Sequence, residues 1–155
     1  MRKNNMEKRS FFAIVLVAML AVGIPQVGAD NVQFDTATVI IFGERFAVEY
    51  AHSPAQRAQG LMFRKSLCED CGMLFYFTPH RKVGMWMKNT YIPLDVAFID
   101  EEGVITDIKA MQPHDLNTTM SSKKVAYSLE MNQGWFKQHN VKVGDTIKID
   151  ISGAQ

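Results

Sequence analysis

The sequence predicts a mainly β domain, a compact antiparallel β-sandwich or small barrel with two short helices. Short segments in which apolar and polar residues alternate recur along the chain. This period of two is typical of strands with one buried face. Turn signals built on glycine or proline separate the segments. Many short strands joined by such turns are typical of sandwiches and small barrels.

The strand prediction rests on alternation within several segments. It is clearest at 46–51, 94–99, 125–131 and 146–151. Further strands are expected at 32–42, 73–77, 83–88 and 104–110. Predicted turns lie at 42–44, 78–80, 101–103 and 143–145. Gly103 ends the stretch before the strand at 104–110 and is expected to adopt positive φ in a hairpin.

Two short helices are expected between the strands. Ser53 is the predicted N-cap of the first helix, a proline follows it, and Gln56 completes a capping box. Gly60 is expected to end this helix. The second helix is expected over 133–139, with Asn132 as its cap. Both are too short to be stable alone, so they are expected to pack on the sheet.

The first 29 residues are predicted to be a secretory signal peptide, which leaves 30–155 as a single mainly β domain. A basic head precedes an apolar run from Phe11 to Ile24, and small residues then lead to a cleavage site after Ala29. The run is short for a membrane span, which needs about 20 residues; an uncleaved N-terminal anchor is the alternative. The protein is therefore expected to be exported, to the periplasm or outside the cell.

Charge limits the partners of the domain. The leader holds four of the 17 basic and one of the 16 acidic residues, which leaves 13 against 15 and a net charge of −2. A slightly acidic domain without a basic run is not expected to bind nucleic acid through its phosphates. It also lacks the polybasic patch that holds proteins on anionic membranes. We therefore expect no nucleic-acid partner and no membrane contact beyond the signal peptide.

Four segments, in this order, resemble the domain of unknown function 192 family. They are RAQGLMFRKSL (57–67), GMLFYF (72–77), WMKNTYIPLDVAFID (86–100) and YSLEMNQG (127–134). The resemblance runs from about Phe46 to Ile149 and implies a compact, mainly β domain, often found behind a signal peptide in prokaryotes. It implies no catalytic residues, because no reaction is settled for that family. Cys68 and Cys71 depart from the usual pattern of the family and look like an addition in this protein.

Cys68 and Cys71 are expected to form a local structural disulfide, as is common in exported proteins. Redox chemistry and metal binding are the alternatives. A redox pair usually begins a helix, which lowers the pKa of its first thiol, whereas a strand pattern follows here. Glu69 and Asp70 would raise the pKa of a neighbouring thiol. A zinc site needs about four ligands, and no second pair or nearby histidine supplies them.

No cofactor or metal is predicted elsewhere. The expected mature chain contains seven methionines, whose thioethers could bind copper(I). Those that fall within strand patterns are instead expected to fill the core. The sequence has no nucleophile motif and no phosphate-binding glycine loop, and its four histidines are scattered.

The segment from Gly84 to Asp95 is the centre of the predicted site. In a strand over 83–88, Trp86 and Lys88 share one face while two methionines share the other. In the structural interpretation, Lys88 pairs with Asp95, Asn89 caps the turn and Trp86 covers the barrel mouth.

In the binding interpretation, Trp86 is a stacking surface beside cationic and orienting side chains. The candidate ligand-binding residues are Arg57, Arg64, Trp86, Lys88, Asn89, Asp95 and Glu130. Apolar walls with a few convergent polar groups are typical of small-ligand sites. Aromatic, amide and charged groups together suit a glycan or a ligand that carries a carboxylate.

The sequence therefore predicts an exported small-ligand-binding or accessory domain of the cell envelope. One alternative is a hydrolase of envelope material that uses Asp95 and Glu130 as paired carboxylates. Such a pair must lie within about 5–10 Å on one concave surface. The other alternative is a purely structural interaction protein, which would present an exposed apolar patch rather than a pocket.

Overall fold

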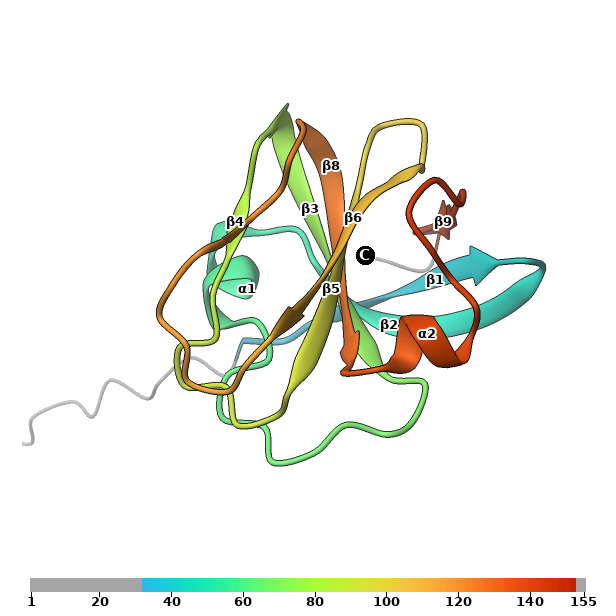
Figure 1. The fold of residues 1–155 in the computed structure, drawn as a ribbon. Helices are drawn as coiled ribbons and strands as arrows, with labels where there is room; N and C mark the ends of the chain where they lie inside the picture. Colours follow the sequence, from blue (N-terminus) through green and yellow to red (C-terminus); the bar gives the residue numbers. More distant parts are fainter. Residues whose placement is uncertain (1–31, 153–155) are drawn as a thin grey trace, which may run out of the picture. The chain divides into compact units, whose positions relative to one another are not determined.

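A seven-stranded sheet dominates residues 32–152, the part of the chain that this computed structural model describes (Figure 1). In spatial order its strands are β6 (Ile105–Met111), β5 (Leu94–Ile99), β8 (Val125–Asn132), β3 (Gly72–Arg81), β2 (Glu44–Ala51), β1 (Asp35–Ile41) and β9 (Lys148–Asp150). A second sheet pairs β4 (Gly84–Met85) with β7 (Thr119–Met120). The helices in these residues are α1 (Pro54–Gln59) and α2 (Trp135–Gln138). The predicted mainly β fold with two short helices is confirmed.

The predicted signal peptide, residues 1–29, lies outside the described residues. Among the residues that the structure does describe, no helix has the length and apolar character that a membrane crossing requires.

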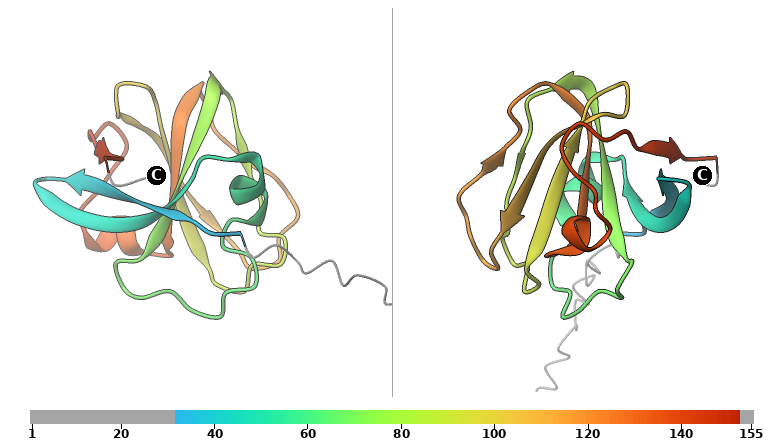
Figure 2. Two further views of the ribbon diagram at one scale, coloured as in Figure 1. Left: turned by 180° about the vertical axis from the view of Figure 1, so that it is seen from behind. Right: turned by 45° about the vertical axis from the view of Figure 1, so that its right-hand side comes forward.

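The first hydrophobic core lies on the face of the sheet shared by β1, β2 and the central strands. Phe46, Val48 and Tyr50 of β2 point into it, as their alternation predicts. The β1–β2 hairpin bends away from β3, β8 and β5, and β9 and α2 lie on the same side (Figures 1 and 2). Trp135 and Phe136 of α2 are buried in this core, which is why so short a helix is stable here.

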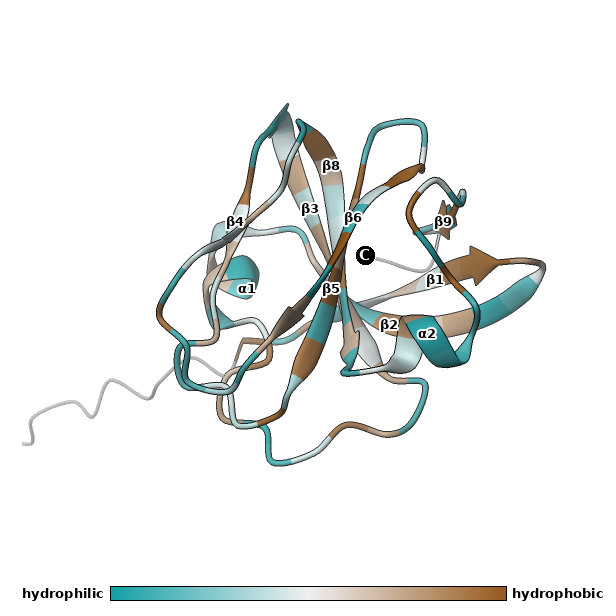
Figure 3. Cartoon of the chain, in the orientation of Figure 1, coloured by the Kyte–Doolittle hydropathy of each residue, from teal (hydrophilic) through white to brown (hydrophobic). Residues whose placement is uncertain are grey.

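A second core lies on the opposite face of β3, β5 and β8. Phe75 of β3 and Val96 of β5 meet Met85 and Met87 there, the latter two from the segment that begins with β4. All six residues of β5 are buried, because the two cores cover both faces of this strand. Brown stretches alternate with teal ones along strands such as β5 and β6, whereas the loop between these two strands is hydrophilic (Figure 3).

One strand pair departs from the antiparallel arrangement. β2 and β3 are parallel, paired over Glu49–Ala51 and Met73–Phe75. Parallel neighbours require a crossover connection, and the chain supplies it with α1 and the long loop that follows. Strand pairing does not close the sheet into a barrel; the two ends approach at the isolated bridge between Val104 and Thr146. The layers are compatible with a sandwich.

Local predictions hold in part. The capping box of Ser53 and Gln56 begins α1 as expected, and Gly103 has a φ of 83°. The predicted turn at 78–80 is wrong, because β3 continues to Arg81 with an irregular ladder to β8 that contains a proline. Asn132 is not the cap of α2: Gly134 occupies that position.

Candidate functional site

A groove of about 240 Å³ lies beside Trp86 and is called the Trp86 groove here. Its lining residues are Arg57, Ala58, Phe75, Phe77, Arg81, Gly84, Met85 and Trp86. α1 supplies the first two of these, β3 the next three, and β4 with the residue after it the last three. α1, β3 and the segment that begins with β4 therefore meet beside Trp86, which the sequence places at the centre of the predicted binding face.

The local conformation of residues 83–90 explains why Trp86 faces outward. Met85 and Met87 are 8% and 2% exposed, whereas Trp86 between them is 49% exposed. The predicted alternation of faces is confirmed, although the regular strand ends at Met85. Beyond it the chain turns, with the Thr90 N–H donating to the Met87 carbonyl at 3.1 Å and Asn89 at a φ of 53°.

Three cations lie around Trp86 without a carboxylate partner among residues 32–152: Arg57, Arg81 and Lys88. The guanidinium carbons of Arg57 and Arg81 are 6.0 and 5.5 Å from the centre of the Phe77 ring. Lys88 Nζ is 5.4 Å from the centre of the Trp86 ring. No carboxylate of residues 32–152 pairs with these three charges, so positive charge gathers beside Trp86.

Backbone carbonyls hold Arg57 in place. Its Nη1 donates to the carbonyl of His52 and, at 3.1 Å, to that of Tyr76. Neutral acceptors orient the guanidinium without cancelling its charge, and its remaining N–H donors have no hydrogen-bond partner among the described residues.

A small crevice, called the Glu130 crevice here, adjoins the Trp86 groove. It measures about 20 Å³ and is lined by Arg57, Ala58, Gln59, Gly60, Met62, Phe75, Met85, Trp86, Thr90 and Glu130. Glu130 is 4% exposed, and burial raises the pKa of its carboxyl to about 8. This carboxyl is therefore mostly neutral at pH 7.

The structure brings together four of the seven predicted ligand-binding residues: Arg57, Trp86, Lys88 and Glu130. Asn89 is half-buried and its backbone carbonyl accepts from the N–H of Phe63 at 2.8 Å. Asp95 is elsewhere: its Oδ2 accepts from the backbone N–H of Gly134 at 2.8 Å. The Lys88–Asp95 pair of the structural interpretation is therefore not formed.

Asp95 and Glu130 do not form a carboxylate pair. Asp95 is opposite Met131 in the β5–β8 ladder, and Glu130 is opposite Val96. Directly opposite residues share a face and adjacent residues alternate, so the two carboxyls lie on opposite faces of the sheet. The arrangement that a two-carboxylate hydrolase needs is absent here.

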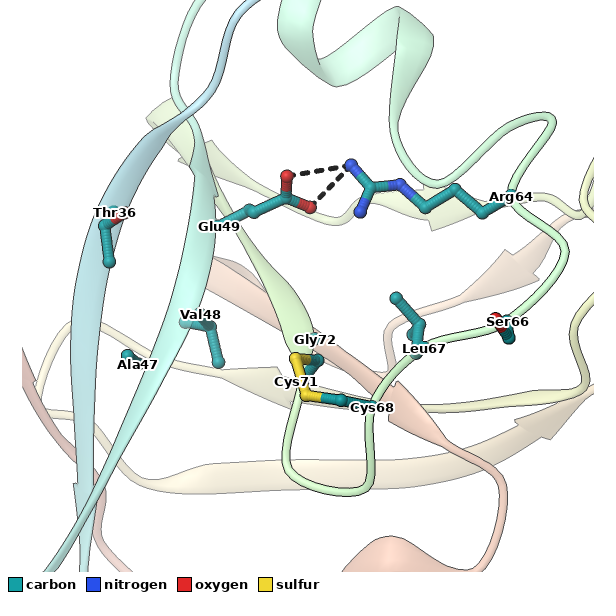
Figure 4. Close-up of a pocket in the computed structure, with 10 residues that line it drawn as sticks. All are labelled: Thr36, Ala47, Val48, Glu49, Arg64, Ser66, Leu67, Cys68, Cys71 and Gly72. Atoms are coloured by element: carbon teal, nitrogen blue, oxygen red, sulfur yellow. Dashed lines mark hydrogen bonds and ion pairs between the residues drawn. A yellow bond between two sulfur atoms is a disulfide. The ribbon is translucent and has the colours of Figure 1, made fainter.

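Arg64 lies in a different groove, of about 380 Å³, between β2 and the loop 64–72 (Figure 4). Its Nη2 is 2.6 Å from Glu49 Oε2, so its charge is already paired. The disulfide of Cys68 and Cys71 borders this groove, with a Cα–Cα distance of 5.0 Å. Among the described residues, no three His, Cys, Asp or Glu side chains gather as metal ligands.

Sequence reasoning missed Arg81 and Phe77 as site residues. Both lie on β3, and the turn that the sequence predicts at 78–80 separates Arg81 from the predicted strand. The available signal was the alternation of Phe75 and Phe77, which places both on the face that becomes the groove.

Comparison with known proteins fixes the family. A family model named DUF192 and described as an uncharacterized ACR matches residues 37–149. This chain belongs to the DUF192 family. The matched region contains every residue of the Trp86 groove. No curated protein matches the chain.

Two solved structures are similar to this DUF192 chain. One, from Sinorhizobium meliloti 1021, is described provisionally as a transcription regulator; it is 41% identical, with a TM-score of 0.68, over 75% of this chain and 93% of that one. The other, from Novosphingobium aromaticivorans DSM 12444, is a protein of unknown function; it is 30% identical, with a TM-score of 0.68, over 78% of this chain and 89% of that one.

Proposed function

We propose that this chain is an exported binding domain of the cell envelope whose ligand is a small organic anion held in the Trp86 groove. One observation carries the proposal. Three cations lie around the half-exposed indole of Trp86: Arg57, Arg81 and Lys88. None of them has a carboxylate partner among the described residues. Cations left unpaired along a groove favour an anionic occupant.

Each side chain has a role in this proposal. The planar guanidiniums of Arg57 and Arg81 suit a carboxylate, which accepts two parallel hydrogen bonds from such a group. The Trp86 indole offers an apolar surface to the body of the ligand. Lys88 adds positive charge beside that indole. A groove of about 240 Å³ limits the occupant to a small molecule.

The description of the Sinorhizobium protein as a transcription regulator does not alter this proposal. From residue 30 onward, this chain has 13 basic and 15 acidic residues. Tight binding to DNA depends on neutralising its phosphates with an excess of Lys and Arg. Regulators also bind small effectors, and the Trp86 groove suits a small ligand whether the domain is a regulator or an exported binding protein.

The test compares a carboxylate with its uncharged amide. Phenylacetate and phenylacetamide are titrated calorimetrically into protein purified from cells that express the full chain. We expect phenylacetate to bind and phenylacetamide to bind at least about tenfold more weakly, since each lost charged hydrogen bond costs about 1.5–3 kcal/mol. Arg81→Gln should weaken phenylacetate binding by a similar factor.

Arg45→Gln is the matched control. Arg45 is also an exposed arginine of the sheet, but it lies on β2, pairs with Asp150 of the edge strand β9, and does not line the groove. It should leave phenylacetate binding unchanged. Equal binding of the acid and the amide, equal effects of the two arginine variants, or no binding of either compound would contradict the proposed function.

A further inference from the structure

The Glu130 carboxyl is buried without a hydrogen-bond partner among the described residues. Glu130 lies on β8 between Met73 of β3 and Val96 of β5, on the face of the second core, and is 4% exposed. Its pKa is raised by burial alone, with no contribution from a hydrogen bond or a neighbouring charge. A buried carboxyl that forms no hydrogen bond lowers the stability of the fold, and such groups are rare in folded proteins.

The remaining exposure of this carboxyl is directed into the Glu130 crevice. Every fully buried side-chain nitrogen or oxygen in residues 32–152 has a hydrogen-bond partner. The oxygens of Glu130 have none, so they retain some surface, and the crevice is the cavity that Glu130 lines. Its carboxyl is thus an unpartnered polar group, more than nine-tenths buried, at the wall of a defined cavity.

The crevice adjoins the Trp86 groove. The two cavities share Arg57, Ala58, Phe75, Met85 and Trp86 in their linings. The crevice has a volume of about 20 Å³, which is room for one water-sized group. A carboxylate has three heavy atoms and does not fit, whereas a hydroxyl does.

The polar atoms of the crevice match a hydroxyl group. Thr90 Oγ1 donates to the Lys88 carbonyl at 3.2 Å, which leaves this oxygen free to accept. A protonated Glu130 both donates and accepts. A hydroxyl also both donates and accepts, so it can satisfy Glu130 and Thr90 together.

We infer that the Trp86 groove selects anions that also carry a hydroxyl, and that this hydroxyl enters the crevice and hydrogen-bonds to Glu130. This inference rests on the proposed function. The ligand class is a hydroxylated carboxylate, such as a hydroxy acid or a sugar acid. Its carboxylate meets Arg57 and Arg81, its body meets Trp86, and its hydroxyl replaces the water that the crevice can hold.

The test uses two pairs of probes that differ in their hydroxyl groups: mandelate against phenylacetate, and D-glucuronate against cyclohexanecarboxylate. Affinities are measured by calorimetry at pH 7 on protein from cells that express the full chain. The hydroxylated member of at least one pair should bind about tenfold more tightly or better, the worth of one well-formed hydrogen bond in a buried site.

Glu130→Leu tests the assignment to this residue. Leucine has a similar shape and no polar atom, and such a replacement of a buried polar group is commonly neutral or stabilising, so the variant should fold. The affinity ratio within the discriminating pair should fall to about one. Arg45→Gln, outside both cavities, should keep the wild-type ratio. Thermal unfolding of each variant verifies that it is folded.

Glu130→Gln and pH provide a second readout. Of the residues that line the crevice, only Glu130 and Arg57 can carry charge, and Arg57 stays protonated. Above its pKa of about 8, Glu130 becomes an anion and repels the bound anion. Affinity for the hydroxylated probe should therefore fall about tenfold between pH 7 and pH 9. Glu130→Gln cannot ionise, so it should abolish this fall.

The outcomes separate the two proposals. If neither member of any pair binds, the proposed function fails and the inference fails with it. If the members of both pairs bind equally, or if Glu130→Leu preserves the preference, anion binding stands and the assignment of Glu130 is wrong. A pH dependence that survives in Glu130→Gln would likewise overturn that assignment.

Discussion

Asp95 and Glu130 are diagonal neighbours across the β5–β8 ladder, and their side chains lie on opposite faces of the sheet. Their surroundings differ accordingly. Asp95 Oδ2 accepts from the Gly134 N–H at 2.8 Å, just before α2, whereas Glu130 faces an apolar core and a crevice. Asp95 therefore stabilises a turn, whereas the Glu130 carboxyl has no hydrogen-bond partner among the described residues.

Asp95→Ala should lower the free energy of unfolding by about 2 kcal/mol. The substitution leaves the N–H of Gly134 without its acceptor, and a hydrogen bond to a charged group contributes about 1.5–3 kcal/mol. Asp95→Asn keeps an oxygen acceptor and should cost less. Urea unfolding measures both changes. Glu102→Ala, at an exposed position, is the control and should change stability by less than about 0.5 kcal/mol. An Asp95→Ala loss no larger than that of the control would contradict this role.

Glu130 should make stability depend on pH. Burial raises its pKa from the ordinary 4.5 to about 8. Between these values the folded state keeps the proton and the unfolded chain releases it, so stability is fully present below about pH 4.5 and is lost as pH rises to about 8. The free energy of unfolding should fall by about 1.4 kcal/mol per pH unit relative to Glu130→Gln.

Urea unfolding of both proteins between pH 5 and pH 8 measures this difference. The lowered pKa of Asp107, whose carboxylate accepts hydrogen bonds from Ser122 and Thr106, does not interfere. It adds stability that is lost only as pH falls below the range of the experiment. Parallel profiles for the wild type and Glu130→Gln would show that the Glu130 carboxyl is not buried in the folded state.

The sequence predicts a strand well when one face of the strand lies in a core and the other lies in solvent. In β2, Phe46, Val48 and Tyr50 are buried while the two residues between them are more exposed, so the period of two is visible. β5 is buried on both faces, and its run of apolar residues does not say which side chains share a face with those of β8. The separation of Asp95 from Glu130 depends on that register, which is a non-local property.

The site was predictable only where its geometry is local. The exposure of Trp86 between Met85 and Met87 follows from alternation along six residues of chain. Arg81 reaches the groove because β3 continues through a proline, which ordinarily signals a turn. Arg64 was expected in the site, but Glu49 of β2 pairs with it in another groove. Which acid an arginine meets depends on tertiary contacts that the sequence pattern does not contain.

Removing the disulfide should cost about 2 kcal/mol. The bond joins Cys68 to Cys71, three positions apart, and closing so short a loop restricts the unfolded chain only modestly. The loop also contacts α2, since Trp135 Nε1 donates to Asp70 Oδ1 at 2.9 Å. The double variant Cys68→Ser, Cys71→Ser is compared with the wild type by urea unfolding. Reductant should destabilise the wild type to the same level and leave the variant unchanged; equal midpoints for the oxidised wild type and the variant would contradict the prediction.

Tryptophan fluorescence should report occupancy of the Trp86 groove. The two tryptophans of the chain differ sharply, because Trp86 is 49% exposed and Trp135 is 2% exposed. Acrylamide reaches exposed indoles, so most quenching in the wild type should come from Trp86. In Trp86→Phe only the buried Trp135 remains, and the quenching constant should fall severalfold.

A bound anion should protect the exposed indole. Saturating phenylacetate should lower the quenching constant of the wild type and leave that of Trp86→Phe unchanged, because the ligand covers Trp86 alone. Arg81→Gln keeps both tryptophans and removes one guanidinium from the groove, so it should need a higher phenylacetate concentration for the same protection. Protection that persists undiminished in Trp86→Phe would mean that the ligand acts through Trp135, and the ligand would then bind beside α2 rather than in the Trp86 groove.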